Sequence, residues 1–184
     1  MRVISGKARR LPLSCPKGME TRPTKDRIKE TLFNIIQNEI PNCVFVDLFS
    51  GSGAIGIEAL SRGASKCFFI DKSKSAITCI RENLLFTKLS DNAIIIQQDA
   101  IDSLYSIHAE HVDILFIDPP YADGYEKELL NSLSNFEYID SNTKIIIEAD
   151  IKTNFDHIET GGYLIEREKT YKTNKLVFLR KQNR

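Results

Sequence analysis

Apolar and polar positions follow two alternating periods along the chain. Five runs rich in Val, Ile, Leu and Phe predict strands buried on both faces, and the segments between them carry apolar residues at helical spacing. The predicted strands are residues 44–48, 67–71, 93–96, 112–117 and 144–148. Two more apolar stretches, 163–165 and 176–179, flank a turn at 172–174 and predict a closing hairpin.

Helices are predicted between most of these strands. Thr24 is a candidate N-cap for a helix that runs to about Glu39 and places Ile28 and Leu32 on one face. Further helices are expected from the glycine loop to about residue 62, after the candidate N-cap Ser73, over about 102–107 and around 126–133. This alternation predicts an α/β fold with a doubly wound, mostly parallel seven-stranded sheet and an antiparallel edge strand. Residues 1–14 are expected to add a small N-terminal β-hairpin.

Length and composition are those of an ordinary globular protein. The chain has 184 residues, 42% hydrophobic and 27% charged, so we expect residues 1–184 to form a single domain with residues 1–24 as a basic extension. No apolar run is long enough to cross a bilayer, and the amino terminus lacks the apolar stretch of a signal peptide. The four cysteines have no metal-ligand spacing, which favours buried reduced thiols. We therefore expect a cytoplasmic monomer that binds neither membrane nor metal.

A net charge of zero hides an uneven distribution of charge. Residues 1–29 hold nine Lys and Arg against two acids, and residues 167–184 hold seven against one. The stretch between them holds nine basic residues against twenty-two acids. Two basic ends around an acidic middle predict a polyanionic partner held by the ends, although basic tails also keep proteins soluble. The candidate phosphate contacts near the amino terminus are Arg2, Lys7, Arg9, Arg10, Arg22 and Lys25.

A glycine loop at residues 51–56 follows the strand at 44–48 and fits the pattern G-x-G-x-x-G. Glycines let the backbone turn tightly and approach a ligand, and Asp71, at the end of the next strand, suits ribose hydroxyls. NAD, FAD and S-adenosylmethionine fit this pattern equally. Two further acids favour S-adenosylmethionine: Asp47 suits the methionyl ammonium, which NAD lacks, and Asp99 suits the adenine amino group.

A proline turn follows the strand at 112–117. Its residues are Asp118, Pro119, Pro120 and Tyr121, and the prolines end the strand because they cannot donate to a β-ladder. The turn resembles motif IV of methyltransferases that modify exocyclic amino groups of nucleic-acid bases. The Asp118 carboxylate and Pro119 carbonyl would stabilise charge that develops on the amine nitrogen, and Tyr121 would stack on the base. The base must first leave its stack.

These motifs together carry a family resemblance. Over essentially its whole length the chain resembles the bacterial 16S ribosomal RNA guanine-N2-methyltransferases of the RsmD type. The resemblance rests on residues 2–7, 22–34, 47–53 and 118–121, and the block at 22–34 is its most specific part. The opening departs slightly from the usual pattern, with Ser5-Gly6 in place of a glycine pair.

The resemblance implies a Rossmann-like class I methyltransferase fold and S-adenosylmethionine as the methyl donor. The acceptor would be the N2 amine of a guanine in 16S ribosomal RNA, either naked or in the assembling small ribosomal subunit. Residues 118–121 would be catalytic. Cofactor-binding roles are expected for Asp47, Phe49, Ser50, Gly51, Ser52, Gly53, Asp71, Lys72, Asp99 and Ala100.

Two alternative functions remain open from sequence. The same proline turn serves N6-adenine methyltransferases that act on DNA or RNA, although DNA enzymes of that kind usually need a separate target-recognition region, for which this chain has little room. A second alternative, from another class, is a non-catalytic RNA-binding module on a methyltransferase fold. The intact glycine loop and the intact turn at 118–121 both argue against it.

Overall fold

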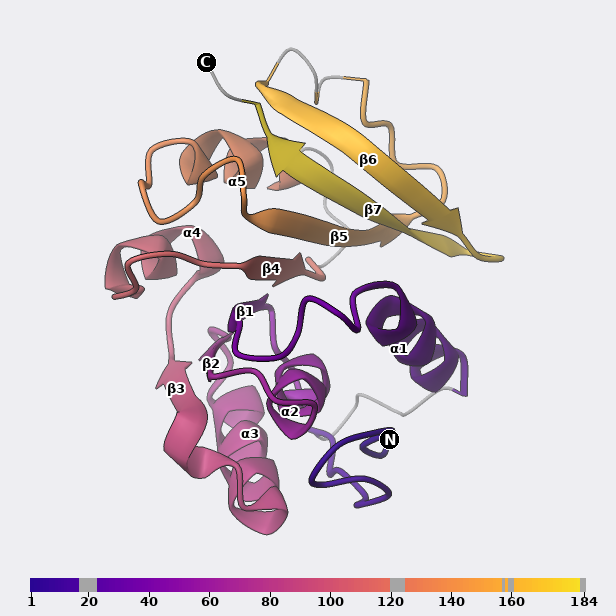
Figure 1. Cartoon of the computed structure of the whole chain (residues 1–184), viewed down its shortest axis with the longest axis vertical. Coiled ribbons are helices and arrows are strands. Elements are labelled where there is room, and N and C mark those ends of the chain that lie inside the picture. Colours follow the sequence, from indigo (N-terminus) through magenta and orange to yellow (C-terminus); the bar gives the residue numbers. More distant parts are fainter. Residues whose placement is uncertain (17–22, 120–124, 157, 159–160, 183–184) are drawn as a thin grey trace.

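A seven-stranded sheet lies at the centre of the computed structural model, which describes residues 1–16, 23–119, 125–156, 158 and 161–182 (Figure 1). Strands β1 to β5 are parallel to one another, whereas β7 is antiparallel to both β5 and β6. The predicted mostly parallel sheet is therefore confirmed, with β6 outermost and the antiparallel β7 one place inside. The spatial order is β3 (Ala93–Ile96), β2 (Lys66–Ile70), β1 (Val44–Leu48), β4 (Ile114–Ile117), β5 (Lys144–Asp150), β7 (Asn174–Lys181) and β6 (Tyr163–Thr170).

The two hairpin strands are longer than the apolar runs that predicted them. Residues 166–170 of β6 are exposed, so polar side chains continue a strand whose apolar signal stops at Ile165. β7 begins at Asn174, which the sequence pattern assigned to the turn. Pairing with a neighbouring strand, rather than side-chain character, extends both elements.

The described helices are α1 (Pro23–Ile35), α2 (Ala54–Ser61), α3 (Lys74–Thr87), α4 (Ala100–Ser103) and α5 (Tyr125–Leu133), with short 3₁₀ helices at Ser90–Asn92 and Leu104–Ser106. Ser73 is the N-cap of α3, as predicted, since its hydroxyl accepts a hydrogen bond from the Ala76 N–H. Two boundaries differ from expectation. α1 begins at Pro23, a residue suited to the first helical position, so Thr24 lies inside the helix, and the chain beyond Ile35 forms a turn.

The expected helix over 102–107 is shorter and begins earlier. α4 is a single turn capped by Asp99, and the 3₁₀ helix at Leu104–Ser106 follows it. The cap explains the early start, because the Asp99 carboxylate accepts the Ile101 N–H that the first turn leaves without a partner.

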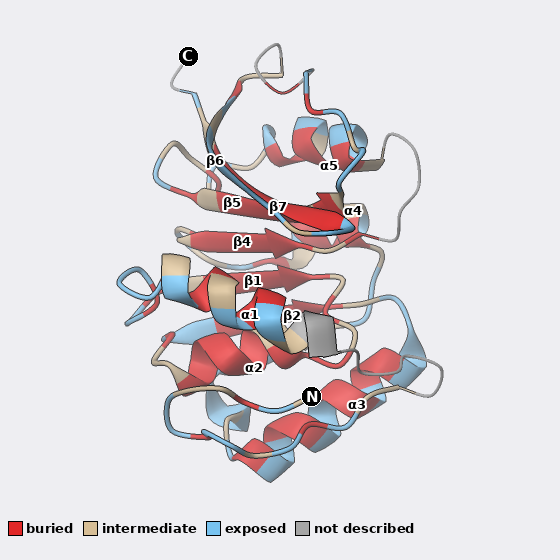
Figure 2. Cartoon of the chain, turned by 90° about the vertical axis from the view of Figure 1, so that its right-hand side faces the viewer, coloured by how far each residue is buried: buried red, intermediate tan, exposed pale blue. Residues whose placement is uncertain are grey.

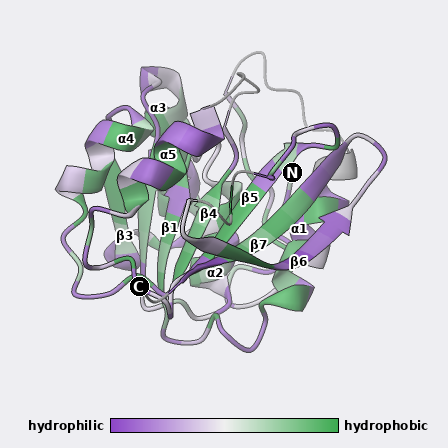
Figure 3. Cartoon of the chain, turned by 90° about the horizontal axis from the view of Figure 1, so that it is seen from above, coloured by the Kyte–Doolittle hydropathy of each residue, from purple (hydrophilic) through white to green (hydrophobic). Residues whose placement is uncertain are grey.

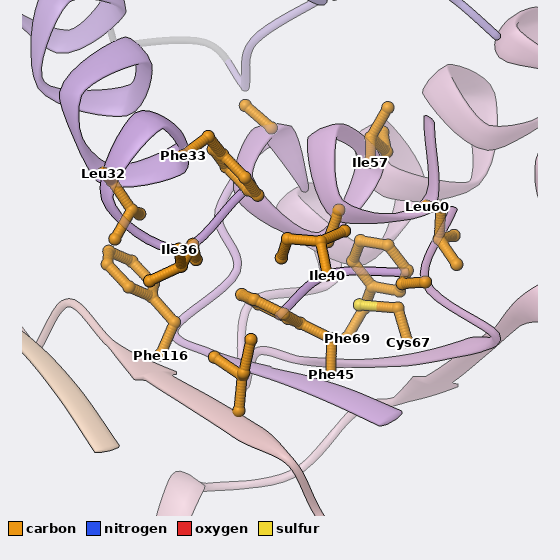
Figure 4. Close-up of a cluster of buried hydrophobic side chains, with 14 of the residues drawn as sticks. Leu32, Phe33, Ile36, Ile40, Phe45, Ile57, Leu60, Cys67, Phe69 and Phe116 are labelled. Atoms are coloured by element: carbon orange, nitrogen blue, oxygen red, sulfur yellow. The ribbon is translucent and has the colours of Figure 1, made fainter. Parts of the chain in front are cut away.

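Helices cover both faces of the sheet (Figures 1 and 2). One hydrophobic cluster joins α1, α2 and α3 to strand residues such as Phe45, Phe69 and Phe116. In Figure 4, Phe33 and Ile36 lie over Phe45 and Phe116. A second cluster joins α4 and α5 to alternate strand positions on the opposite face. Figure 3 shows hydrophobic residues concentrated in the strands and hydrophilic ones along the outer helices and loops, as a doubly wound sheet requires.

Residues 1–13 form an extension that packs against α2. The arms of the expected hairpin run antiparallel and share an isolated bridge between Arg2 and Pro12. Three backbone hydrogen bonds also join the arms, from the N–H groups of Val3, Arg10 and Leu13 to the carbonyls of Leu11, Val3 and Met1. Tertiary contacts hold the extension as well. The fully buried Glu58 carboxylate accepts the Ile4 and Ser5 N–H groups at 2.8 and 3.0 Å.

A buried charge network completes this attachment. Glu58 pairs with Lys29 of α1 at 3.3 Å and with Arg62 at 2.7 Å, and Lys29 Nζ also donates to the Arg2 carbonyl. Burial lowers the pKa of Lys29, against the opposing effect of the Glu58 charge. Because an unpaired buried charge is costly, removing any member of this network should loosen the extension, α1 and α2 together.

Gly6 is the position where the extension lies against the α2 backbone. It has φ of +83°, and a Cβ atom there would lie 1.8 Å from the Ser61 carbonyl oxygen. Gly63 provides a matched control, since its φ is +106° but the nearest atom to a Cβ is 4.0 Å away. The two positions share backbone strain and differ in the collision.

We expect Gly63→Ala to cost about 1–2 kcal/mol of unfolding free energy from left-handed strain alone. Gly6→Ala should cost roughly 1–3 kcal/mol more, because the extension must separate from α2. Urea unfolding measures both values, and trypsin should cut after Arg9 and Arg10 faster in the Gly6 variant. Equal losses in the two variants would contradict the close docking of the extension.

Candidate active site at the carboxyl ends of the strands

The carboxyl ends of four neighbouring strands meet at one edge of the sheet. Leu48, the last residue of β1, pairs with Ile70 of β2 and Ile117 of β4, and Ile70 pairs with Ile96 of β3. The segments that follow these strands therefore begin side by side. They carry the glycine loop, Asp71, Asp99 and Asp118, so the register brings together the acids that the sequence analysis singled out.

Asp47 lies one residue before the end of β1 and is almost completely buried. One of its carboxylate oxygens accepts the Gly56 N–H at 3.0 Å, which ties the strand to the first turn of α2. Burial, as the largest effect, together with the nearby charges of Asp118 and Asp71, raises the pKa of Asp47 to about 8 against the opposing effect of the Gly56 hydrogen bond. Through this hydrogen bond Asp47 holds the first turn of α2, where the glycine loop ends, against β1.

The glycine loop is held by short hydrogen bonds on both sides. The Ser50 hydroxyl donates to the Asp47 carbonyl at 2.6 Å and accepts the Ile70 N–H at 2.9 Å, which joins the loop to β2. Phe49, Gly51 and Gly53 all have positive φ, and Phe49 is the one among them that has a side chain. Such a conformation is uncommon for an aromatic residue and is typical of functional loops.

Gly56 is required by packing. A Cβ atom there would lie 2.4 Å from Phe69 and 2.7 Å from the Cys67 sulfur, both of which are fully buried in β2. The third glycine of the pattern therefore lets α2 approach the sheet closely, a role that such a glycine commonly has. The same close approach puts the Gly56 N–H within reach of Asp47.

Asn83, a residue of α3 that the sequence analysis missed, contacts the glycine loop. From the middle of α3, its buried side-chain amide donates to the carbonyls of Ser52 and Ser14, at 2.9 and 3.0 Å, and its oxygen accepts the Ser14 N–H. It therefore joins the glycine loop to the end of the amino-terminal extension. An isolated Asn in a helical pattern gives no local signal of this contact.

Asp71 is held by two backbone donors at the end of β2. The Gly51 N–H reaches one carboxylate oxygen at 2.9 Å, and the Ser73 N–H reaches the other at 2.8 Å. Each oxygen retains a second lone pair, so the half-exposed group has capacity for further donors such as ribose hydroxyls. Lys72, beside it, is exposed and lies 4.0 Å from Asp99.

Asp99 combines a structural role with partial exposure. It is the N-cap of α4, and the next residue, Ala100, is buried. The oxygen that accepts the Ile101 N–H, at 3.2 Å, also accepts the Tyr125 hydroxyl at 3.2 Å. The sequence analysis did not single out Tyr125, because the contact joins two elements far apart in the chain.

The proline turn begins at the same edge. Asp118 follows the last residue of β4 and is half-buried, and Pro119 is buried. The effect of the Asp118 charge on Asp47 shows that the two carboxyls are electrostatically coupled. Pro120 and Tyr121 lie outside the described residues, so their predicted roles stay predictions.

The candidate phosphate contacts divide into two groups. Arg2, Lys7, Arg9 and Arg10 are exposed on the extension, whereas Arg22 and the Lys25 side chain lie outside the described part of the chain. At the other end several cations are engaged within the protein. Lys175 pairs with Glu168, Arg180 pairs with Glu166, and Lys181 donates to two backbone carbonyls. Arg167, Lys169 and Lys172 are exposed there, so exposed positive charge is present on the extension and on the β6–β7 hairpin.

No helix among the described residues is long and apolar enough to span a membrane. Within the same residues, no three His, Cys, Asp or Glu side chains gather in a way that would hold a metal ion.

Known proteins match the whole of this architecture. A family model described as "Conserved hypothetical protein 95" covers residues 1–180. The ribosomal RNA small subunit methyltransferase D of Haemophilus influenzae is 34% identical over 154 residues, which make up 82% of this chain and 79% of that protein. The Escherichia coli K12 protein of the same name is 31% identical over 169 residues, 92% of this chain and 84% of that one.

A solved structure agrees with these relatives. The structure of yhhF from Escherichia coli has a TM-score of 0.87 and 29% sequence identity, and the match covers 100% of this chain and 99% of that one. The strand order and this likeness establish a Rossmann-like class I methyltransferase fold. The resemblance predicted from the motifs is confirmed, and the chain belongs to the RsmD family of methyltransferases.

Proposed function

We propose that this protein transfers a methyl group from S-adenosylmethionine to the N2 amine of a guanine in 16S ribosomal RNA. The relatives of the same family are named as methyltransferases of small-subunit ribosomal RNA. The observation that carries the proposal is the arrangement at the carboxyl edge of the sheet. There Asp71 and Asp99, both part-exposed, follow β2 and β3, and Asp118 follows β4 beside the glycine loop.

The three carboxylates are hydrogen-bond acceptors that suit S-adenosylmethionine. Asp71 would accept the ribose hydroxyls, Asp99 would accept the adenine amino group, and Asp47 would favour the methionyl ammonium from beneath the loop. The cofactor supplies an electrophilic methyl group on a sulfonium. The three carboxylates would hold and orient it.

Asp118 and Pro119 would act on the acceptor amine. Its lone pair is delocalised into the ring, and it becomes available as the N–H groups donate to the Asp118 carboxylate and the Pro119 carbonyl. These contacts strengthen as positive charge develops on nitrogen, so they stabilise the transition state more than the ground state. After transfer, Asp118 would accept the proton that the product ammonium loses.

The extension would hold the RNA. We propose that Arg2, Lys7, Arg9 and Arg10 contact phosphates, and that Arg22 and Lys25, which come later in the sequence, do the same. Residues 1–184 would act as one domain, since Val3 and Leu13 of the extension belong to the same hydrophobic cluster as α1, α2 and α3. An rRNA substrate implies a cytoplasmic site of action, and the monomeric state stays a prediction.

Labelled methyl transfer tests the function. Unmodified 16S RNA is offered naked and as an assembling small subunit, and the product is digested to nucleosides. We expect label in N2-methylguanosine. Label in N6-methyladenosine would instead support the adenine alternative, and cofactor binding without transfer to either form would support the non-catalytic one.

Asp118→Asn should lower the single-turnover rate of methyl transfer by about 10²–10³-fold, because an amide cannot match the carboxylate as the amine becomes charged. Binding of S-adenosylmethionine should change little. Asp91→Asn, an exposed acid before β3, serves as the control and should be fully active. A near-normal rate in the Asp118 variant would rule out the catalytic role.

Cofactor binding should depend on pH through Asp47. Its pKa of about 8 means that the carboxyl is mostly protonated at pH 6 and ionises as the pH rises. A cationic ligand favours the ionised form, so affinity should rise by roughly tenfold from pH 6 to pH 7. The ligand's own amino group, with a pKa near ~8, stays cationic over this range.

Calorimetric titration at each pH measures the dependence. Asp47→Asn keeps an acceptor for the Gly56 N–H and should flatten the profile between pH 6 and pH 7. A wild-type affinity that does not change over this range would contradict the coupling of cofactor binding to the ionisation of Asp47.

Arg9→Gln/Arg10→Gln should lower the salt slope of RNA binding, log K against log [salt], by about 1.5, as expected for two lost phosphate contacts. Arg167→Gln/Lys169→Gln removes the same charge from exposed positions on β6, at the opposite edge of the sheet from β3. Filter binding across salt concentrations gives both slopes. Equal effects of the two pairs would mean that net charge, and not the extension, governs binding.

A further inference from the structure

Tyr125 contacts both Phe49, which lies just before the glycine loop, and Asp99, the acid that follows β3. It is the first residue of α5, the helix that follows the proline turn in the chain. Its hydroxyl donates to Asp99 Oδ1 at 3.2 Å. Its ring meets the ring of Phe49 edge to face, with centroids 5.6 Å apart and planes at 73°.

The hydroxyl contact restricts how Asp99 can turn. Oδ1 accepts both the Ile101 N–H, from the same segment, and the Tyr125 hydroxyl, from α5. Two donors from different elements hold this oxygen in place, so the direction of Oδ2 is set as well. Oδ2 lies 4.0 Å from Lys72 Nζ, a side chain that is 73% exposed, and the Asp99 side chain is itself 39% exposed.

The protonation state of the Tyr125 hydroxyl suits this role. Burial, followed by the neighbouring charge of Asp99, raises the pKa of Tyr125 above its usual value. The hydroxyl therefore remains a donor throughout the neutral range.

The ring of Tyr125 contacts Phe49, whose backbone conformation is strained. Phe49 has φ of +65°, an uncommon conformation for a bulky residue, which persists only where surrounding contacts hold it. Tyr125 supplies one such contact. The two halves of the side chain thus act on two separate parts of the cofactor site.

We propose that Tyr125 is a positioning residue that makes the site selective for an amino-purine: its hydroxyl orients Asp99 toward the exocyclic amine of adenine, while its ring supports Phe49. The inference rests on the proposed cofactor site and deepens it. A purine with oxygen at that position, as in hypoxanthine, presents an acceptor to Asp99 and should bind more weakly.

Two ligands separate this role from general stabilisation. S-adenosylhomocysteine carries the amino group, and S-inosylhomocysteine differs in having oxygen there. We expect the wild-type protein to prefer the first. Tyr125→Phe keeps the ring contact with Phe49, so it should weaken binding of S-adenosylhomocysteine by about three- to tenfold, the size of one net hydrogen bond, and change binding of S-inosylhomocysteine by less than about twofold.

Tyr138→Phe is the matched control. Its hydroxyl also donates a part-buried hydrogen bond, to the Leu104 carbonyl at 2.6 Å, but this bond does not involve Asp99. It should leave the preference between the two ligands unchanged. In an Asp99→Asn background, Tyr125→Phe should lose most of its effect on S-adenosylhomocysteine, because the residue acts through Asp99.

The outcomes separate the inference from the proposed function. Equal weakening of both ligands by Tyr125→Phe, or an unchanged preference, overturns the role of Tyr125 while the cofactor site stands. If the wild-type protein binds both ligands equally, the site does not recognise the amino group, and the inference is overturned while the cofactor site stands. A wild-type protein that binds neither overturns the inference and the proposed function together.

Discussion

The hydrogen bond from the Gly56 N–H to the buried Asp47 carboxylate is the constraint on which the rest of the site depends. It requires α2 to lie so close to the sheet that residue 56 can have no side chain, since a Cβ there would collide with Phe69 and Cys67. It also places an acid of raised pKa beneath the loop. The Ser50 hydroxyl then joins the loop to β2. Phe49, Gly51 and Gly53 have positive φ values in this short segment between β1 and α2.

Parallel register turns this local constraint into a functional edge. Because β1 to β4 end together, Asp71, Asp99 and Asp118 lie beside the loop without any element dedicated to bringing them there. Two of these acids also hold backbone N–H groups, so the same carboxylates that stabilise the segments after β2 and β3 offer remaining lone pairs to a ligand. Glu58 and Lys29 hold the extension, and Asn83 joins the chain at its end to the glycine loop.

Local patterns were sufficient to predict the strands, the glycine loop and the Ser73 cap, because each depends on residues close together in sequence. They failed where an element is defined by a distant partner. β6 continues through exposed polar residues because it pairs with β7. Asn83 and Tyr125 each join segments far apart in the chain, and neither residue type signals such a contact. Pro120 and Tyr121, outside the described residues, remain predictions from sequence.

A crystal structure with S-adenosylhomocysteine tests the central claim most directly. We expect the adenine amino group within about 3 Å of Asp99, the ribose hydroxyls at Asp71 and the sulfur facing Asp118 across the glycine loop. A ligand bound away from the carboxyl ends of β1 to β4, or bound there with its sulfur directed away from Asp118, would contradict the assignment of this edge as the site of methyl transfer.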